Sequence, residues 1–440
     1  MIFEPGTYTS WGRIARVAHP IGRPRYRDEI APALAGRGNG KMLAVGLGRS
    51  YGDSVLNSGG ALIDMSGLDR VMAFDVETGV LRAEAGLSLD VLLRLIVPRG
   101  WFLATTPGTR FVTLGGAVAN DVHGKNHHMA GSFGCSVRRL GLVRSDGSHH
   151  ELDRETGGKL LLATIGGLGL TGIITWVEVD LVRIPSAILD VERIPFANVG
   201  SFFRLAEASA KSFEHTVAWI DCANGGSSLG RGIFQRANWC EGELTPHASR
   251  LKAVVPFEPP SGALNGFTVR AFNSVYYRMQ KRGAPRSRQH YATFFYPLDA
   301  IGKWNRLYGR RGFYQYQCVI GPEHAEPAVT ELVKQIARVG AGSFLAVLKT
   351  LGSRSSGGLL SFPRAGATLA LDFANRGDRT LELLGRLDKV VLEAGGRLYP
   401  AKDGRVPAAV FRAGYGENLP AFTAQVDPGC SSDFWRRVSA

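Results

Sequence analysis

The stretch NDVHGKNHHMAGSFG (residues 120–134) places three of the chain's ten histidines, His123, His127 and His128, within six positions. A metal site is the first interpretation, because His123 and His127 are spaced i, i+4 and would share one face of a helix. Gly124 and Gly131 within the stretch disfavour a regular helix, and no third ligand follows at a recognisable spacing. We therefore expect no metal here, and structural roles for His127 and His128.

Three glycine-rich loops flank or include this stretch: VGLGRSYGDS (45–54), TPGTRFVTLGGAVAND (106–121) and GGLGLTG (166–172). Clustered backbone N–H groups form concave sites for anions, so the three loops indicate an extended ligand that carries phosphate. The first loop departs from the dinucleotide fingerprint G-x-G-x-x-G, because its third glycine, Gly52, comes one residue late. It also leads toward a strand instead of opening a helix, which disfavours a nicotinamide-binding Rossmann domain.

Length and composition limit the remaining function classes. A chain of 440 residues exceeds a single hydrophobic core, so two domains are expected. Hydrophobic residues make up 45% and charged residues 20%, which is typical of a globular protein. The net charge of +14 favours an anionic partner, either a membrane surface or a phosphorylated substrate. No arginine-rich tract or nucleic-acid module stands out, so nucleic acid is not expected.

Cysteine usage and the first residues bear on the compartment. The five cysteines are odd in number and form no C-x-x-C, which argues against a disulfide framework and a zinc ribbon and favours a reducing compartment. The start, MIFEPGTYTSWGR, lacks a basic region followed by an apolar one, so no signal peptide is expected. No apolar run reaches the length of a transmembrane helix. We expect a cytoplasmic protein or one bound peripherally at the membrane.

The pattern of apolar residues predicts two regions that meet at Pro185. In the first region a short apolar run at 42–46 ends in the first glycine loop. We expect a strand at 61–68, two strands within 70–86, a helix over 88–100 that Ser88 caps and Gly100 stops, a hairpin that turns at Asp146–Gly147, and a β-rich run within 163–184. In the second we expect strands at 216–223, 288–299, 312–321, 343–352 and 367–374, helices at 324–340 and 379–396, and a long, mobile loop at 239–265.

The glycine loops, the DVHGKNHH string, YPLDAIGKWNRLYG (296–309), FYQYQCV (313–319) and GGRLYPAKD (395–403) together resemble one family. It is the decaprenylphosphoryl-β-D-ribose 2′-oxidase family, within the vanillyl-alcohol-oxidase/PCMH superfamily of flavoproteins. The resemblance covers nearly the whole chain. It implies an α+β fold with a PCMH-type FAD-binding domain at 1–186 and a substrate-binding domain at 187–396, built on an antiparallel sheet flanked by helices. A C-terminal segment at 397–440 would return to the FAD-binding domain.

The family's activity implies the expected reaction. The 2′-hydroxyl of a polyprenylphosphoryl-β-D-ribofuranose would be oxidised to the 2′-keto sugar by noncovalently bound FAD, with a quinone or oxygen as electron acceptor. A separate short-chain reductase would complete the epimerisation to an arabinose donor for cell-envelope arabinan. Three alternatives remain: an FAD-dependent oxidase or dehydrogenase of another sugar or alditol, a UDP-sugar reductase that also uses NADPH, and a flavoprotein without catalytic activity.

The resemblance also assigns residues. Lys402 would accept the proton or tune the flavin, with His123 beside the flavin ring and Tyr51 completing the catalytic set. The residues expected to bind FAD are Gly46, Gly48, Arg49, Ser50, Tyr51, Gly52, Asp53, Pro107, Gly108, Thr109, Gly115, Gly116, Ala117, Asn120, His123, Gly124, Gly169, Thr171, Gly172 and Ile173. Those expected to face the substrate are Lys125, Trp219, Gln315, Gln317, Lys349, Ala370 and Lys402.

One position departs from the family pattern. Mycobacterial members carry a cysteine before Val-Asp-Phe, whereas this chain has Ala370 before Leu-Asp-Phe. That cysteine is the target of covalent nitroaromatic inhibitors, and hydride transfer does not need its thiol. We therefore expect the chemistry to be retained and the covalent inhibition to be lost.

Overall fold

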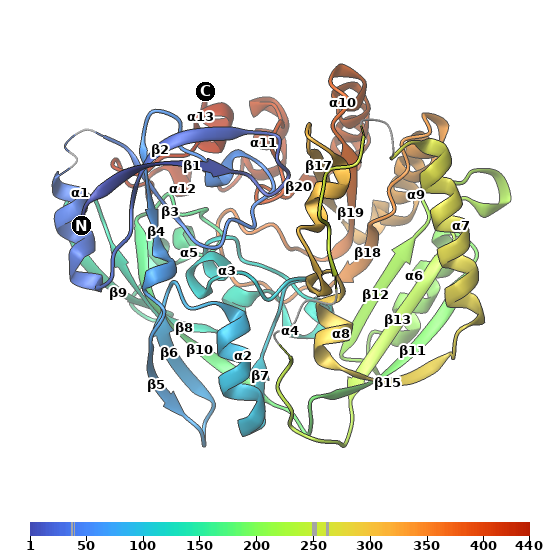
Figure 1. Cartoon of the computed structure of the whole chain (residues 1–440), viewed down its shortest axis with the longest axis horizontal. Helices are drawn as coiled ribbons and strands as arrows, with labels where there is room; N and C mark the ends of the chain where they lie inside the picture. Colours follow the sequence, from blue (N-terminus) through green and yellow to red (C-terminus); the bar gives the residue numbers. More distant parts are fainter. Residues whose placement is uncertain (37, 39, 249–252, 261–263) are drawn as a thin grey trace.

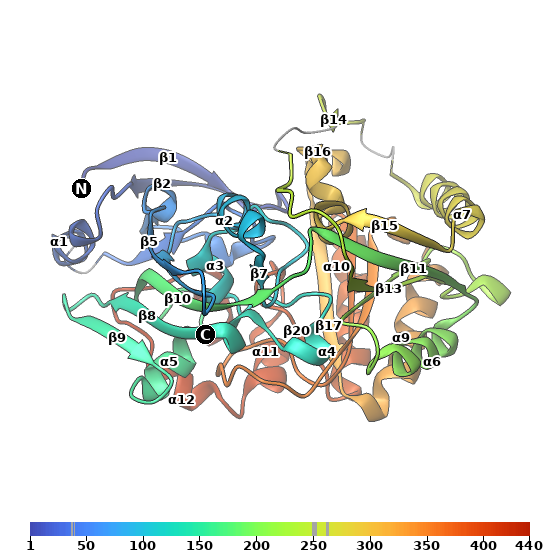
Figure 2. The same ribbon diagram turned by 90° about the horizontal axis from the view of Figure 1, so that it is seen from below.

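The protein is described by a computed structural model (Figure 1) that covers residues 1–36, 38, 40–248, 253–260 and 264–440. The fold is α+β, as expected. In Figures 1 and 2 the N-terminal elements, blue to teal, lie beside a second body drawn green to orange. The red C-terminal helices follow the second body in the chain and contact both bodies.

Two sheets form the N-terminal body. The first has the order β1 (Phe3–Thr9), β2 (Arg16–Gly22), β4 (Ala61–Asp64) and β3 (Met42–Val45). The second has the order β5 (Val71–Asp75), β6 (Val80–Glu84), β10 (Ile173–Arg183), β8 (Val137–Val143) and β9 (His149–Asp153), with β7 (Trp101–Leu103) also paired to β10. The two strands expected within 70–86 and the hairpin at Asp146–Gly147 are therefore confirmed.

Short helices pack on these sheets: α1 (Ile30–Gly36), α2 (Leu89–Ile96), α3 (Leu114–Ala119), α4 (His127–Ala130) and α5 (Gly158–Thr164). The signals predicted for α2 are present. Ser88 caps it by accepting a hydrogen bond from the Val91 amide (3.2 Å), and a 3₁₀ turn continues it to Arg99. Gly100 then takes φ = 75°, the left-handed conformation that glycine adopts most readily.

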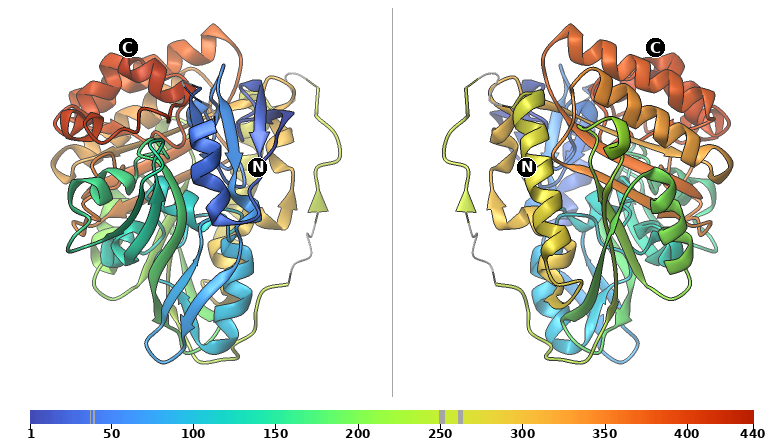
Figure 3. Two further views of the ribbon diagram at one scale, coloured as in Figure 1. Left: turned by 90° about the vertical axis from the view of Figure 1, so that its left-hand side faces the viewer. Right: turned by 90° about the vertical axis from the view of Figure 1, so that its right-hand side faces the viewer.

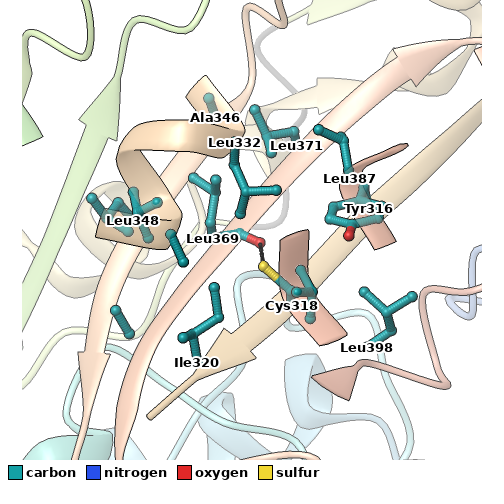
Figure 4. Packing of buried hydrophobic residues seen from close by; sticks show 14 of the residues in the cluster. Tyr316, Cys318, Ile320, Leu332, Ala346, Leu348, Leu369, Leu371, Leu387 and Leu398 are labelled. Atoms are coloured by element: carbon teal, nitrogen blue, oxygen red, sulfur yellow. Dashed lines mark hydrogen bonds between the residues drawn. The ribbon is translucent and has the colours of Figure 1, made fainter. Parts of the chain in front are cut away.

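A large antiparallel sheet forms the second body, in the order β15 (Arg286–His290), β11 (Ile188–Phe196), β13 (Gly232–Trp239), β12 (His215–Ile220), β18 (Ala346–Leu351), β19 (Gly366–Ala374), β17 (Phe313–Ile320) and β20 (Arg397–Leu398). Helices α6 (Val199–Ser209), α9 (Pro322–Arg338) and α10 (Asp378–Glu393) pack on one face. Figure 4 shows Cys318, Leu369 and Leu348 in this packing. Because side chains alternate along a strand, the residues next to these three on each strand point to the opposite face of the sheet.

On the side away from α6 and α9 lie α7 (Gly266–Arg282) and α8 (Tyr291–Phe295) (Figures 2 and 3). The prediction of a strand over 288–299 was therefore wrong beyond His290, where β15 ends. The His290 ring accepts a hydrogen bond from the Ala292 amide (3.2 Å) and starts α8, and a 3₁₀ turn follows at Pro297–Ala300. The apolar run is mostly buried, although Thr293 is exposed, and its composition alone did not distinguish helix from strand.

The loop expected at 239–265 lies partly outside the described residues, which omit 249–252 and 261–263. Its described parts make defined contacts. The ring of His247 is buried, with Nε2 2.9 Å from Asp90 Oδ1 and Nδ1 2.6 Å from the Tyr291 hydroxyl. Farther along, β14 (Ala253–Val254) pairs with β16 (Ile301–Gly302).

The C-terminal residues form α11 (Ala408–Tyr415), α12 (Leu419–Thr423) and α13 (Asp433–Ser439). Cys430 forms a β-bridge with Met42, and Arg437 donates to both carboxylate oxygens of Asp53 (2.7 and 2.9 Å). The domain limits at 186 and 396 stay predictions. Within the described part of the chain, no helix combines the length and the apolar character needed to cross a bilayer.

Candidate active site

A cavity of about 1350 Å³ lies between the glycine loops and the large sheet. It exceeds the range of roughly 300–1,000 Å³ common for ligand pockets, so it has room for a long ligand. Asp299 is the one carboxylate among the described residues that line it. The basic lining residues are Arg49, Lys125, Arg193, Lys303, Lys349 and Lys402. This excess of positive charge suits an anionic ligand.

The first glycine loop offers backbone donors to the cavity. Among the residues that the structure describes, the five amides from Gly46 to Ser50 donate no hydrogen bond. Tyr8 braces the loop by donating to the Gly46 carbonyl (3.1 Å), and Gly48 has φ = 62°. A Cβ on Gly46 would come within 2.4 Å of Thr113 Oγ1. Consecutive free amides in a tight turn form a nest for anions, which fits the pyrophosphate of FAD.

The other two loops continue this wall. A Cβ built on Gly108 would meet no atom within 4 Å, so its backbone is open to the cavity. Gly169 has φ = 75° and also lines the cavity. The predicted residues Pro107, Thr109, Gly115, Gly116, Asn120, Gly124 and Gly172 line it as well. A wall built mainly of backbone lets a flat ligand approach closely.

Five predicted cofactor residues do not line the cavity: Gly52, Asp53, Ala117, Thr171 and Ile173. Asp53 is paired with Arg437 instead, and the Thr171 hydroxyl lies 2.9 Å from that of Thr164. Ala117 and Ile173 are fully buried. In the structure these residues support the loops from behind, and their predicted contact with the cofactor stays a prediction. A motif does not reveal which of its residues turn away from the ligand.

His123 lies where the glycine loops meet the sheet. Its Nε2 is 2.9 Å from Gln317 Nε2 on β17, and its Nδ1 is 3.1 Å from Lys349 Nζ on β18. Lys349 also donates to the Gly124 carbonyl (3.2 Å). Burial and the adjacent Lys349 ammonium hold the pKa of His123 well below its usual value. The ring is therefore neutral at pH 7 and joins the two walls of the cavity.

Three lysines surround this point and are partly buried. Burial lowers the pKa of Lys125 and of Lys349 to about 7, and that of Lys402 to about 8. Lys125 donates to the Phe294 carbonyl, while Lys402 lies over the Tyr51 ring, 3.9 Å from its centroid. Amines that titrate near neutrality can either hold an anion or accept a proton.

Asp372 on β19 was missed by the sequence prediction. It pairs in register with Gln315, whose amide donates to it (2.7 Å), and the Tyr308 hydroxyl donates to it as well (3.2 Å). Burial raises the pKa of Asp372 to about 7, and its charge raises that of Lys402. The LDF sequence around it was visible, but only the pairing of β17 with β19 places it beside Gln315.

The sheet gives the cavity a continuous floor. Residues paired across neighbouring antiparallel strands share a face, and one such row runs through Gln317, Ala370, Val347, Trp219 and Ile233. All five line the cavity. Four steps of roughly 4.8 Å make the row about 19 Å long. It is polar at the His123 end and apolar beyond. Val347 and Ile233 were not predicted.

The remaining residues of the histidine stretch hold the loop in place. Asp121 is fully buried and accepts hydrogen bonds from the Gly134 amide (2.8 Å) and from the hydroxyls of Ser132 (2.9 Å), Ser356 (2.6 Å) and Ser361. His128 Nε2 lies 2.9 Å from the Phe213 carbonyl. The described residues contain no group of histidine, cysteine or acidic side chains that could hold a metal ion.

Comparison with known proteins agrees with this geometry. The FAD binding domain family matches residues 23–153. The chain is 35% identical to the decaprenylphosphoryl-β-D-ribose oxidase of Mycolicibacterium smegmatis over 92% of its own length and 90% of the relative's. It is 31% identical to the uncharacterized protein in the mprA 5′ region of Streptomyces coelicolor, over 80% of this chain and all of that one. The protein is thus an FAD-dependent oxidoreductase that belongs to the decaprenylphosphoryl-β-D-ribose oxidase family.

Proposed function

We propose that the protein oxidises the 2′-hydroxyl of a polyprenylphosphoryl-β-D-ribofuranose to the 2′-keto sugar, the first half of an epimerisation to the arabinose donor for cell-envelope arabinan. The observation that carries this proposal is the group of three partly buried lysines at the His123 end of the floor, Lys125, Lys349 and Lys402. In such a substrate the phosphate is on the carbon next to the reacting one. It must therefore bind within a few ångströms of the reacting hydroxyl, and clustered lysines suit that demand.

Lys402 is the proposed proton acceptor. Its pKa of about 8 leaves part of the amine neutral at pH 7 to 8, where a general base works best. The charge of Asp372 opposes the effect of burial and keeps this pKa from falling further. Lys125 and Lys349, protonated when they meet an anion, would hold the phosphate. Gln315 and Gln317 would orient the sugar from the floor.

FAD, when bound, supplies the acceptor for the hydride from the sugar carbon. The glycine loops would hold its pyrophosphate, and His123 would lie beside its ring. We expect the flavin to be bound noncovalently. Both ring nitrogens of His123 already contact protein groups, Gln317 and Lys349, which supports this expectation. Acid precipitation should release all of the yellow cofactor into solution.

The proposed reaction implies further partners. Electrons leave the reduced cofactor to a quinone or oxygen. The ketone is consumed by a reductase of the short-chain type, which returns the 2′-carbon to a secondary alcohol with the opposite configuration. A polyprenyl chain keeps the substrate in a membrane, which is consistent with the net charge of +14.

The decisive experiment is anaerobic reduction of the purified holoenzyme by a candidate substrate. Loss of the flavin absorbance measures the reduction. A water-soluble short-chain prenylphosphoryl-ribose should bleach it, and free alditols should not. The corresponding 2′-deoxyribose phosphate lacks the reacting hydroxyl and serves as the matched control. If alditols bleach the flavin and the prenylphosphoryl sugar does not, the proposed substrate is wrong and an alditol oxidase takes its place. Bleaching by NADPH would favour a reductase.

A further inference from the structure

Helix α7 leaves an apolar face uncovered. Phe272, Val275 and Met279 are 51, 54 and 65% exposed, and their spacing of i, i+3 and i+7 puts them on one face of the helix. The opposite side is fixed to the body, because Asn273 is buried and donates to Asp221 (2.9 Å) and to the Ser343 carbonyl (3.1 Å). The exposed residues therefore belong to a helix that is held in place.

The surroundings of this face are basic. From Pro259 to Leu298 the sequence contains six arginines and lysines and no acidic residue. Arg270, Arg278, Lys281 and Arg282 lie on α7 and are exposed. Apolar side chains beside lysine and arginine form the composition that binds the surface of an anionic bilayer, where each cation near the surface adds affinity. The charge points to anionic lipid as the partner.

A second exposed apolar group lies on the same side of the molecule. Val254 and Phe257 are 49 and 71% exposed. The segment that carries them is held by Arg306, which donates to the carbonyls of Val255 (3.5 Å) and Pro256 (3.1 Å). Figures 2 and 3 both place β14, which contains Val254, on the side that α7 occupies. The two groups could therefore meet one surface together.

The inner side of α7 covers the far end of the cavity. Val269, Tyr276 and Gln280 line it, as does part of the half-exposed Phe272, which packs against Tyr276 and Phe344 at the edge between the two sides. The Tyr276 ring packs edge-on against Trp219 of the floor, with centroids 4.8 Å apart. The apolar part of the floor thus leads from Ala370 to a position beneath α7. One helix combines an outward face suited to lipid with an inward face over an apolar channel.

We propose that α7 is a membrane-docking helix, whose outward apolar face rests in the interface of an anionic bilayer while the lipid chain of the substrate passes beneath it into the cavity. The docking surface comprises Phe272, Val275 and Met279 with the four basic residues of α7, and Val254 and Phe257 extend it. The route of the lipid chain rests on the proposed function. The docking of α7 itself does not, because it follows from exposure and charge.

The first test is sedimentation of the FAD-loaded full chain with vesicles. Wild-type protein should sediment with vesicles of equal parts phosphatidylglycerol and phosphatidylcholine, and much less with phosphatidylcholine alone. The variant Val275→Ser/Met279→Ser should lose at least about fivefold in affinity, because it loses apolar contact. The control Val71→Ser/Met72→Ser removes comparably exposed apolar residues from β5 (40 and 37%) and should bind like wild type.

The contribution of charge is tested by Arg278→Gln/Lys281→Gln/Arg282→Gln, which should weaken binding most at low salt. Failure of wild type to bind the anionic vesicles, or equal binding by the Val275/Met279 variant, would overturn the proposal. So would a wild-type dimer that this variant converts to a monomer in gel filtration without lipid, because the face would then be covered by a second copy.

Activity separates this proposal from the proposed function. Val275 and Met279 do not line the cavity, so their variant should oxidise a soluble short-chain substrate at the wild-type rate. It should be several-fold slower on a long-chain substrate presented in vesicles. If no prenylphosphoryl-ribose is oxidised by wild type, the proposed function fails while vesicle binding still decides the docking of α7. If both variants oxidise vesicle-borne substrate equally, the route beneath α7 is wrong.

Discussion

The two walls of the cavity are built by different means. The glycine loops present backbone amides, with free donors from Gly46 to Ser50, whereas the sheet presents side chains from a register-paired row that runs from Gln317 to Ile233. A backbone wall is local, since neighbouring residues in one loop form it. A side-chain wall needs five strands to pair correctly. The first wall suits a cofactor of fixed shape, and the second suits a substrate whose recognition depends on individual side chains.

The largest effect should come from breaking the backbone wall. In Gly46→Val, the new Cβ would come within 2.4 Å of Thr113 Oγ1, so the loop must shift and its amides must turn from their present positions. We expect purified protein without flavin, seen as loss of absorbance near 450 nm relative to 280 nm.

Gly36→Val is the matched control, because a Cβ at Gly36 meets nothing within 4 Å. It should retain its flavin. A Gly46→Val protein with full flavin content would mean that this loop does not hold the cofactor.

Breaking the side-chain wall should leave the flavin bound and stop the chemistry. Lys402→Met keeps the length of the side chain and removes the amine. We expect anaerobic flavin reduction to slow by about 10²-fold or more, the usual contribution of a general base. Lys303→Met changes another lysine of the cavity lining and should have little effect. If Lys402→Met lost flavin but kept the wild-type rate of reduction per bound flavin, Lys402 would not be the proton acceptor.

The pH dependence tests how the sheet tunes this amine. Only neutral Lys402 accepts a proton, so the reduction rate should rise with pH through about 8. Asp372 raises the pKa of Lys402, and Asp372→Asn removes that charge. The midpoint should therefore move to lower pH, by roughly one unit for a nearby charge. A merely structural role for Asp372 would lower the amplitude of the profile and leave its midpoint in place.

The smallest effect on rate should follow from Ala370→Cys. Ala370 lines the floor between Gln317 and Val347, and a thiol there has no role in hydride transfer. Turnover should stay near wild type. Intact-mass spectrometry after turnover with a nitroaromatic inhibitor should show no adduct on the wild-type protein and one adduct on the variant. An adduct mapped to the wild-type cavity would refute the expectation.

The difference between the walls also explains what the sequence could predict. The loops were found because the glycines of each loop lie close together in the sequence. Local periodicity of apolar residues was enough to predict α2, β17 and α10. Asp372, Val347 and Ile233 were not found, because their place on the floor depends on strand order and register. The orientation of Asp53 and Thr171 behind the loops depends in the same way on packing with residues distant in the chain, such as Arg437.

The prediction of a strand over residues 288–299 failed for a different reason. Tyr291, Phe294, Phe295 and Tyr296 are all buried, so four aromatic residues within six positions dominate the composition of the run. The helical i, i+3, i+4 spacing of Tyr291, Phe294 and Phe295, the His290 cap and the following proline decided its outcome, but an aromatic run by composition favours strands.

Asp121 has a consequence for the protein as a whole. Its carboxylate belongs to the cofactor wall, yet two of its hydrogen-bond donors, Ser356 and Ser361, lie in the connection between β18 and β19 of the substrate sheet. Unfolding of the substrate sheet alone would remove these two donors from a carboxylate that stays in the folded cofactor wall, at a cost in free energy. The two bodies should accordingly melt in a single cooperative transition, and their shared apolar packing has the same effect, since Leu168 packs with the second body and Phe295 with the first.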